Sequence, residues 1–252
     1  MAPTAPSSPP LVGDLATARF AVVDVETNGL RSRRHRVIQV AVVTVRGDGT
    51  VIDRWVTDVR PRGSRVGPHE VHGITRARLR AAPRFGAVAP ELVRRLNGAV
   101  LVAHNAGFDW AFLRNELSRA GYRVPSPRRL DTLRLSRGLD PERLLGHSLA
   151  NVTERYGVIN GRAHDALADA EATAAVLPLL LSAAGVTTLD SLEPHVWGHE
   201  ASWPAYTTSR WVSTRWWLGR LRPRLPRRVR IWRARRRRAR LASAPPPPTS
   251  SM

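Results

Sequence analysis

The chain has 252 residues, of which 42% are hydrophobic, and this allows one large domain or one domain with appendages. Cysteine is absent, which excludes a disulfide framework, a catalytic thiol and a cysteine-ligated metal. The formal net charge is +20, and all 40 basic residues are arginine, whose rigid donor forks suit phosphate oxygens. Fourteen of these arginines lie in residues 201–252, where no acid occurs.

The N-terminal part predicts a leader followed by three strands. Residues 1–16 are rich in proline, serine and alanine and are expected to form a disordered leader, since they lack the pattern of a secretory signal. A continuous apolar run over residues 19–25 predicts a strand that is buried on both faces. Residues 37–45 and 51–59 predict two further strands, joined by a hairpin turn at Gly47-Asp48-Gly49.

The middle of the chain alternates between helical and strand patterns. Residues 61–68 are predicted as loop, and an arginine-rich polar stretch follows residues 69–75. Apolar residues at helical spacing predict a helix over residues 85–96, and residues 99–103 predict a short strand. A second helical pattern includes Phe108 and ends at Gly121, so a helix is expected to follow this strand directly.

The next segment predicts a strand and two helices. Residues 130–132 predict a short strand that ends in a turn, and residues 148–156 predict a helix with Ser148 as its N-cap. An alanine-rich helix is expected from residue 163 to about residue 181. Pro178 should kink or stop its last turns, because proline cannot donate a backbone hydrogen bond.

The order of these elements indicates an α/β fold with a mixed sheet. The compact domain is expected to cover residues 17–185. Residues 186–252 are expected to form a linker and a largely disordered basic tail. The most apolar run, residues 172–186, is interrupted by Pro178 and too short to span a bilayer, so we expect no transmembrane segment and a cytoplasmic protein.

Two carboxylates stand near the end of the first strand. Asp24 and Glu26 are two residues apart, so in a strand their side chains point to the same face. Two carboxylates on one face of an apolar strand repel each other and resist desolvation. A bound divalent cation removes both penalties, and nearby arginines at a frayed strand end are the alternative explanation.

Further acids and a histidine fit the same centre. Asp109 lies in the first turn of the helix after the strand at residues 99–103. Asp169 lies in the alanine-rich helix, five residues after His164, and five residues correspond to about 140° on a helix. His164 must therefore sit on the entry loop or the first turn if it is to lean over the same centre, and Asp165 then fits as the N-cap.

These residues belong to five motifs that occur in a fixed order and spacing. The motifs are Asp24-Val-Glu26-Thr-Asn-Gly29, Val71-His-Gly-Ile-Thr75, His104-Asn105-Ala-Gly-Phe108-Asp109, Leu130-Asp131-Thr132 and His164-Asp-Ala-Leu-Ala-Asp169-Ala-x-Ala-Thr173. With them the chain resembles the DEDDh group of the DnaQ-like 3′–5′ exonucleases, the family of the proofreading subunit of bacterial replicative polymerases. The resemblance covers roughly residues 17–181, and the spacing from His164 to Asp169 is that of the histidine subgroup.

The resemblance implies an RNase H-like fold, with a five-stranded mixed sheet flanked by helices, and two divalent ions, Mg²⁺ or Mn²⁺. By position, Asp24 would bridge both ions, and Glu26 and Asp169 would complete the first site. Asp109 would hold the second ion, directly or through water, and His164 would be the general base.

The resemblance also suggests residues that line the terminal nucleotide. Thr27, Asn28 and Phe108 correspond to such positions, although Phe108 is equally compatible with an ordinary place in the core. His72 with Gly73 would line the loop on the substrate side, and the alternative is a turn that uses the conformational freedom of glycine.

Three functions remain open from the sequence. The first is a metal-dependent 3′–5′ exonuclease that releases nucleoside 5′-monophosphates from single-stranded DNA ends. The second is an RNA-trimming or oligoribonucleotide-degrading exonuclease with the same residues. The third is a non-catalytic nucleic-acid-binding scaffold, which the retention of four mutually repelling carboxylates disfavours. The sequence includes no polymerase domain, so a proofreading role would require a polymerase or repair complex.

The C-terminal tail combines arginine with tryptophan. Five tryptophans lie among the fourteen arginines of residues 201–252, and a charge run of one sign cannot collapse into a core. Arginine with interleaved tryptophan favours nucleic-acid binding through phosphate contacts and base stacking. A solubilising extension is the second interpretation, and a segment on an anionic membrane surface is the third.

Deleting residues 201–252 is expected to weaken substrate binding, and most strongly at low salt, because phosphate contacts by arginine release counterions. The measurement is KM for a single-stranded oligonucleotide as a function of salt, with the full-length chain as the control. An unchanged KM and an unchanged salt slope would leave the tail without a role in substrate binding.

Overall fold

Strand β1 (Arg19–Thr27) lies inside the sheet of the computed structural model, with a neighbouring strand on each side. Its apolar residues from Phe20 to Val23 are fully buried, as the continuous apolar run predicts. Strand β2 (Val37–Arg46) pairs antiparallel with β1, and β3 (Val51–Asp58) pairs antiparallel with β2. The predicted three-stranded antiparallel start is therefore confirmed.

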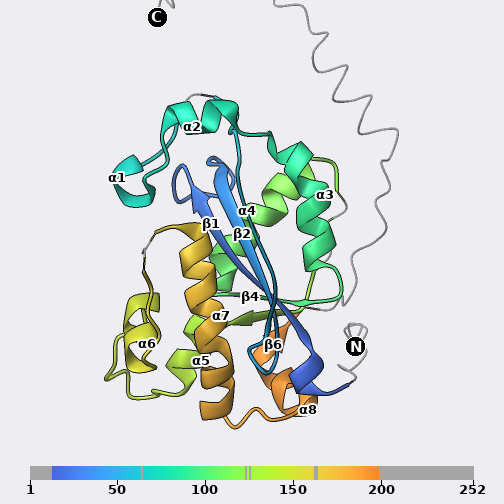
Figure 1. Ribbon diagram of the computed structural model, residues 1–252, viewed down its shortest axis with the longest axis vertical. Coiled ribbons are helices and arrows are strands. Elements are labelled where there is room, and N and C mark those ends of the chain that lie inside the picture. The colour runs from blue at the N-terminus through green and yellow to red at the C-terminus, as the bar shows by residue number, and fades with distance from the viewer. Residues whose placement is uncertain (1–12, 64, 123, 125, 162–163, 199–252) are drawn as a thin grey trace, which may run out of the picture. The chain divides into compact units, whose positions relative to one another are not determined.

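The structure describes residues 13–63, 65–122, 124, 126–161 and 164–198 (Figure 1). The expected leader up to residue 12 and the expected tail from residue 199 lie outside the described residues. The other elements are, in chain order, η1 (Leu15–Thr17), α1 (His69–His72), α2 (Arg76–Ala81), α3 (Phe85–Leu96), β4 (Val100–Ala103), α4 (Ala106–Arg119), β5 (Arg129–Asp131), α5 (Thr132–Gly138), α6 (Leu149–Arg155), α7 (Ala166–Ala183), α8 (Leu189–Leu192), η2 (Glu193–His195) and β6 (Val196–Trp197).

The strands form one mixed sheet in the order β3-β2-β1-β4-β5-β6. Strand β4 runs parallel to β1 and β5 runs parallel to β4, whereas β6 returns antiparallel to β5. The predicted α/β fold with a mixed sheet is confirmed, but the described sheet has six strands where five were expected.

Helices cover both faces of the sheet, and β1 contributes alternate side chains to each. Phe20 and Val22 pack into the core beneath α5, α6 and α7. Ala21 and Val23 pack into the opposite core beneath α3 and α4. Because side chains alternate along a strand, Asp24 and Glu26, which lie two and four residues after Val22, face α7. The strand therefore delivers its two carboxylates to the α7 side.

The sixth strand lies in a segment that the sequence assigned to the linker. Helix α8 buries Leu189 and Leu192 in the core beneath α7, and β6 pairs with β5. The Trp197 ring lies 4.8 Å from the Arg134 guanidinium, and the Arg128 side chain forms an ion pair with Glu193 at 3.2 Å. The folded domain thus extends past residue 185, and a strand of two residues has no periodicity by which the sequence reveals it.

The expected stop at Pro178 is wrong, because α7 continues through it to Ala183. The missing hydrogen bond costs about 3 kcal/mol in a helix interior. Leu177, Leu180 and Leu181 are buried against the sheet, and each contributes about 1.5–3 kcal/mol of burial. Packing therefore outweighs the local penalty. The same helix is long and apolar enough to cross a membrane by composition, but it contacts β1 and β2 as a core helix does.

Several short elements were also missed. Leu15 in η1 is buried, so the ordered domain begins inside the segment expected to be a leader. Helix α2 begins at the N-cap Thr75, and its one buried residue, Leu79, packs on Ile38 and Ile74. Helix α5 begins at the N-cap Asp131. One or two helical turns present too few apolar residues for a periodic signal.

Gln39 connects three elements near the end of β1. Its side chain is buried in β2, and its amide nitrogen donates to Asp58 Oδ1 in β3 at 3.0 Å. Its amide oxygen accepts from the backbone N–H of Ala166, the first residue of α7, at 3.3 Å. Arg78 of α2 also donates to Asp58 Oδ1, at 2.8 Å. Hydrogen bonds through Arg78, Asp58 and Gln39 therefore connect α2 to the start of α7.

Replacing Gln39 by leucine is expected to lower the free energy of unfolding by about 1–3 kcal/mol, because the Ala166 N–H loses its buried acceptor. The measurement is urea unfolding at pH 7. Asp58→Asn is the matched control. It removes a charge from the same hydrogen-bonded network but keeps an oxygen that accepts from Gln39. If the free energy of unfolding falls no more in Gln39→Leu than in Asp58→Asn, a structural role of the Gln39 amide is contradicted.

Candidate active site

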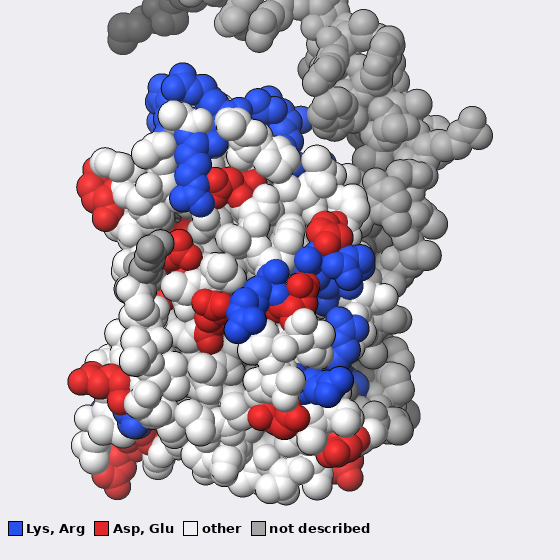
Figure 2. All heavy atoms as spheres, viewed as in Figure 1, with Lys and Arg blue, Asp and Glu red and all other residues white. Residues whose placement is uncertain are grey.

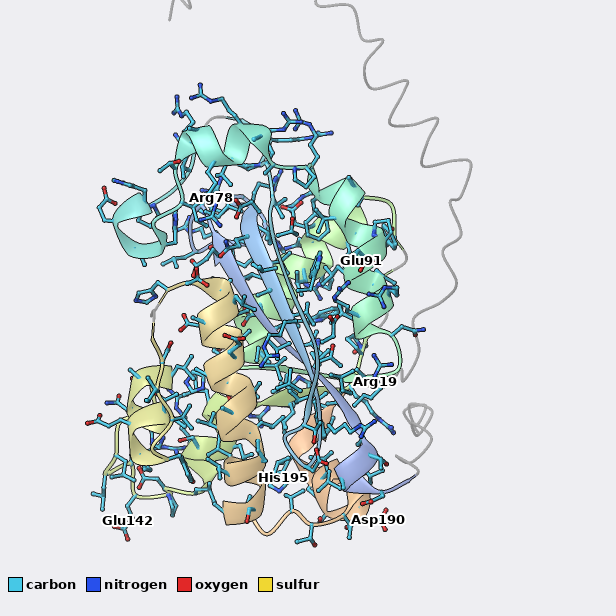
Figure 3. The ribbon with its side chains drawn as sticks, in the orientation of Figure 1. Arg19, Arg78, Glu91, Glu142, Asp190 and His195 are labelled. Atoms are coloured by element: carbon cyan, nitrogen blue, oxygen red, sulfur yellow. The ribbon has the colours of Figure 1, made fainter. Side chains whose placement is uncertain are left out.

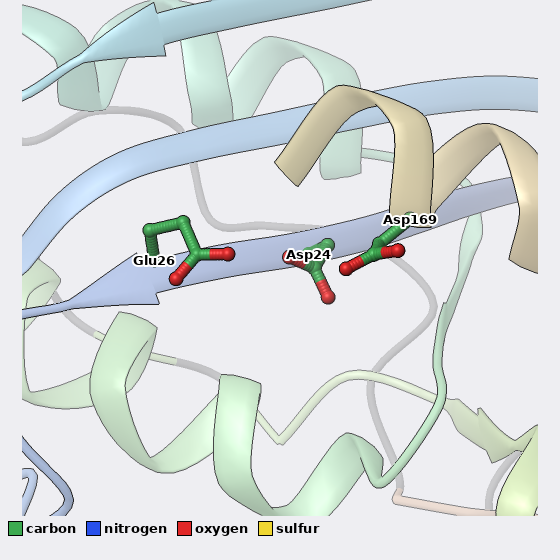
Figure 4. Close-up of side chains that lie close together, drawn as sticks. All are labelled: Asp24, Glu26 and Asp169. Carbon is green, nitrogen blue, oxygen red and sulfur yellow. The ribbon is translucent and has the colours of Figure 1, made fainter. Parts of the chain in front are cut away.

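Three carboxylates converge between β1 and α7. The side chains of Asp24, Glu26 and Asp169 offer oxygen atoms that all lie within 4.8 Å of one another. Figure 4 shows the first two along β1 and the third coming from α7, with the three carboxylates close together. The prediction that Asp24 and Glu26 share a face is confirmed, and the facing helix supplies the third acid. All three side chains are half-buried.

Asp169 is held in place by groups on the loop that enters α7. One of its oxygens accepts from the Asn160 side-chain amide at 2.8 Å, and the other accepts from the backbone N–H of His164 at 2.9 Å. Asp165 caps α7 by accepting from Leu167 N and Ala168 N, as predicted. His164 therefore precedes the helix, with a φ of 67°, and its side chain is exposed.

Asp109 reaches the same strand from the other side. It lies in the first turn of α4 and is almost fully buried. Its Oδ1 accepts from the backbone N–H of Val25 at 3.2 Å, so it contacts β1 between the two carboxylate-bearing residues. Among the described residues, Asp109 is not part of the group within 4.8 Å, but its charge raises the pKa of Asp24.

Burial and mutual repulsion dominate the electrostatics of these acids. Burial, and then the charges of Asp109, Asp169 and Glu26, raise the pKa of Asp24 well above its usual range. Burial and then Asp169 raise the pKa of Glu26 to about 7. Burial raises the pKa of Asp109 to about 8, although the Val25 hydrogen bond opposes this shift. The ionised cluster is therefore unfavourable without a compensating positive charge.

The donor set fits hard divalent cations. Every side chain in the group within 4.8 Å offers carboxylate oxygen, which Mg²⁺ and Mn²⁺ prefer. In the described part of the chain, none of the ion pairs joins an arginine to Asp24, Glu26, Asp109 or Asp169. The alternative of neighbouring arginines at a frayed strand end is therefore not supported, and a cation would relieve the repulsion.

The loop after β1 is tightly organised. Thr27 is buried, and its hydroxyl donates to the Gly29 carbonyl at 3.0 Å. Asn28 accepts from the backbone N–H of Arg36 at 2.7 Å and donates to the carbonyl of Arg65 at 3.1 Å. Both residues follow Glu26 directly, but their side-chain hydrogen bonds serve the loop itself.

The other two predicted substrate residues differ in their surroundings. Phe108 is half-buried beside Asp109, and its ring centroid lies 4.9 Å from that of Phe112, so it packs on the core while retaining an exposed edge. His72 is buried in α1, and its Nδ1 accepts from the backbone N–H of Ile74 at 3.1 Å. Burial lowers the pKa of His72, which favours its neutral form. Its described contact thus stays within its own loop.

Two residues that support the site were missed by sequence reasoning. Asn160 holds Asp169, and Gln39 holds the first turn of α7. Asn160 stands in a Val-Ile-Asn-Gly turn, where asparagine is common for local reasons, so no pattern marks it. Gln39 did carry a signal, because it is the one polar residue among the apolar residues 37–43 and lies opposite Glu26 in the strand register.

The raised carboxylate pKa values predict that the metal-free protein loses stability as the pH rises. Between about pH 4 and pH 8 the folded state binds more protons than the unfolded state, so its stability falls through this window. Asp24→Asn removes one repelling charge and is expected to raise the Tm of the metal-free protein at pH 8 by about 3 °C or more. Thermal unfolding with a chelator at pH 5 and pH 8 measures both effects.

Glu142→Gln is the matched control for this comparison, because Glu142 is an exposed acid in the segment between α5 and α6 (Figure 3). Adding Mg²⁺ should stabilise the wild-type chain more at pH 8 than at pH 5, and should stabilise Asp24→Asn less. A destabilised Asp24→Asn protein at pH 8 without metal would contradict the repulsion.

Comparisons with known proteins agree with this geometry. The model of an exonuclease family matches residues 21–177. The 3′–5′ exonuclease DinG of Bacillus subtilis is 34% identical over 157 residues, which cover 62% of this chain and 17% of DinG. The PolC-type DNA polymerase III of Thermotoga maritima is 34% identical over 181 residues, which cover 70% of this chain and 13% of the polymerase. The chain thus spans less than a fifth of the length of either relative.

Solved structures show the same fold. Exonuclease I of E. coli in complex with a dA16 oligonucleotide superposes with a TM-score of 0.61 at 24% sequence identity, covering 71% of this chain and 44% of that one. The mixed sheet flanked by helices is thus that of exonucleases with an RNase H-like fold. The family match covers more than half of the chain and contains all four site acids. The chain therefore belongs to the DnaQ-like 3′–5′ exonuclease family.

Proposed function

We propose that the protein is a metal-dependent 3′–5′ exonuclease that releases nucleoside 5′-monophosphates from single-stranded DNA ends. The observation that carries the proposal is the convergence of carboxylates from β1 and α7, with Asp109 of α4 bonded to the backbone between them. Such a group of repelling acids is costly for folding and useful for binding cations. Family membership makes phosphodiester hydrolysis the reaction to test first.

The proposed roles of the acids combine their positions in the family motifs with the contacts in the structure. Asp24 has the other three acids around it, and its charge interacts with each of them, so it would contact both ions. Glu26 and Asp169 would complete one ion site with it, and Asp109 would hold the second ion, directly or through water. The ions would lower the pKa of an attacking water and stabilise charge on the leaving oxygen.

His164 is the proposed general base. It stands on the entry loop of α7, where its backbone N–H is bonded to Asp169 and its side chain is exposed. Histidine is the most frequent general base in enzymes, and an imidazole nitrogen at this place could take the proton of a water molecule. Thr27, Asn28 and the exposed edge of Phe108 would border the terminal nucleotide, and His72 would support the adjoining loop.

DNA is the proposed substrate because the relatives and structural neighbours point to it. The polymerase relative is a DNA polymerase, and Exonuclease I was solved with a DNA oligonucleotide. A polymerase or repair complex is the corresponding proposed partner, in the cytoplasm. We further propose that residues 13–198 form the exonuclease domain and that the arginine-rich residues 201–252 add affinity for nucleic acid.

Asp24→Ala is expected to abolish metal-dependent release of mononucleotides, and His164→Asn is expected to lower kcat by about 10²–10⁴-fold with metal still bound. The measurement is a time course on labelled single-stranded DNA and RNA of both polarities, with Mg²⁺, with Mn²⁺ and with a chelator. His195→Asn is the matched histidine control, because His195 lies in η2, outside the elements that carry the carboxylates (Figure 3).

Full activity of Asp24→Ala would overturn the proposed site. Faster release of mononucleotides from RNA than from DNA would show that RNA is the substrate, and the proposed active site would still stand. Activity that resists chelation would exclude the proposed role of the cations.

A further inference from the structure

Arginines gather on a surface next to the carboxylates. We call it the arginine cap and define it as residues 31–36, 60–63 and 65–84, which include the loop after β1 and helices α1 and α2. The space-filling view shows arginine side chains gathered over α2 at one end of the molecule (Figure 2). Ten arginines of the cap are exposed: Arg31, Arg33, Arg34, Arg60, Arg62, Arg65, Arg76, Arg78, Arg80 and Arg84.

The few acids of this region are already paired. Asp58 of β3 binds Arg78, and Glu70 lies 2.9 Å from His69. Glu116 of α4 faces Arg36 and Arg119. In the described part of the chain, no ion pair involves the side chains of Arg76 or Arg80. The cap therefore carries a large positive charge that the surrounding protein does not neutralise.

The cap is joined directly to the loop that follows the carboxylates. Asn28 bonds to the backbone of Arg36 on one side and to the carbonyl of Arg65 on the other. Gly67 approaches Asn28 so closely that a Cβ at this position would lie 2.7 Å from the Asn28 Cα. Arg119 of α4 also fixes the loop after β1 by donating to the carbonyls of Ser32 and Arg33. The cap and the end of β1 are therefore one continuous surface.

We propose that the arginine cap binds the phosphodiester backbone of the single strand on the 5′ side of the nucleotide being removed. This inference rests on the proposed function, because it places the terminal nucleotide at the carboxylates. Successive phosphates of a strand leaving that position meet the cap, whose guanidinium groups bind them without reading the bases. The cap thus supplies affinity for long substrates and adds nothing to the chemistry at the terminal phosphodiester.

Arg76→Gln/Arg80→Gln tests this assignment in the full chain. Both side chains are exposed, and glutamine keeps the helix propensity of α2. Arg19→Gln/Arg46→Gln is the matched control, because these two exposed arginines pair in the strand register at the opposite end of β1. Arg76→Lys/Arg80→Lys keeps the charge and tests for rescue. The substrates are dT12, U12 and the p-nitrophenyl ester of thymidine 5′-monophosphate, which has no upstream strand.

For the cap pair, KM for dT12 at low salt is expected to rise on the order of ten-fold, and the salt slope of binding to fall by about 1.4, with kcat unchanged. KM for U12 should rise by a similar factor, because contacts to phosphate do not involve the 2′-hydroxyl. Hydrolysis of the ester should be unchanged, the lysine pair should recover most of the affinity, and the control pair should change KM less than two-fold.

An unchanged KM for dT12, or an equal rise in the control pair, would overturn the proposal. A loss of ester hydrolysis in the cap pair would also overturn it, since the cap would then act through the site. Anisotropy of fluorescein-labelled dT12 separates this proposal from the proposed function. If the wild-type chain cleaves nothing, a selective loss of binding in the cap pair still supports the cap, whereas equal binding rejects it.

Discussion

Mutual repulsion between buried carboxylates is the constraint on which this structure depends. Asp24 lies within reach of the charges of Glu26, Asp109 and Asp169, and burial adds to the penalty of ionising it. A flexible chain would move these groups apart. Here the acids come from β1, α4 and α7, which the sheet and its two cores hold in place. The fold thus maintains an arrangement that its own electrostatics oppose, and a bound cation would make it favourable.

Hydrogen bonds from outside the cluster fix two of the acids, Asp109 and Asp169, without neutralising them. Asp109 receives the Val25 N–H, and Asp169 receives the Asn160 amide and the His164 N–H. These donors are neutral, so they orient the carboxylates but leave their charge for a ligand. Gln39 acts one step further out by fixing the first turn of α7. The same residues therefore contribute to stability and to the precision of the site.

Much of the fold was predictable because its strongest signals are long and periodic. The apolar runs of β1 and β2 and the helical spacing of α3 identify those elements, and the order of the acidic motifs identifies the candidate site. The two-residue β6 and the short α1, α2 and α5 have too few residues to show a period. The helix does not stop at Pro178 because burial of the leucines around it outweighs the local penalty of proline in a helix. Asn160 was missed because its role exists only after α7 has folded against β1.

The alternation of side chains along β1 ties activity to folding in a way that has an evolutionary consequence. Phe20 and Val22 share a face with the carboxylates, while Val23 and Val25 fill the opposite core. Losing one codon upstream of Asp24 within this strand would send both acids into the apolar layer beneath α3 and α4. Such a deletion would not give a folded but inactive domain. It would give an unfolded polypeptide that proteases degrade. An insertion or deletion in this strand would therefore face selection on two counts, loss of the carboxylate site and loss of the packed core.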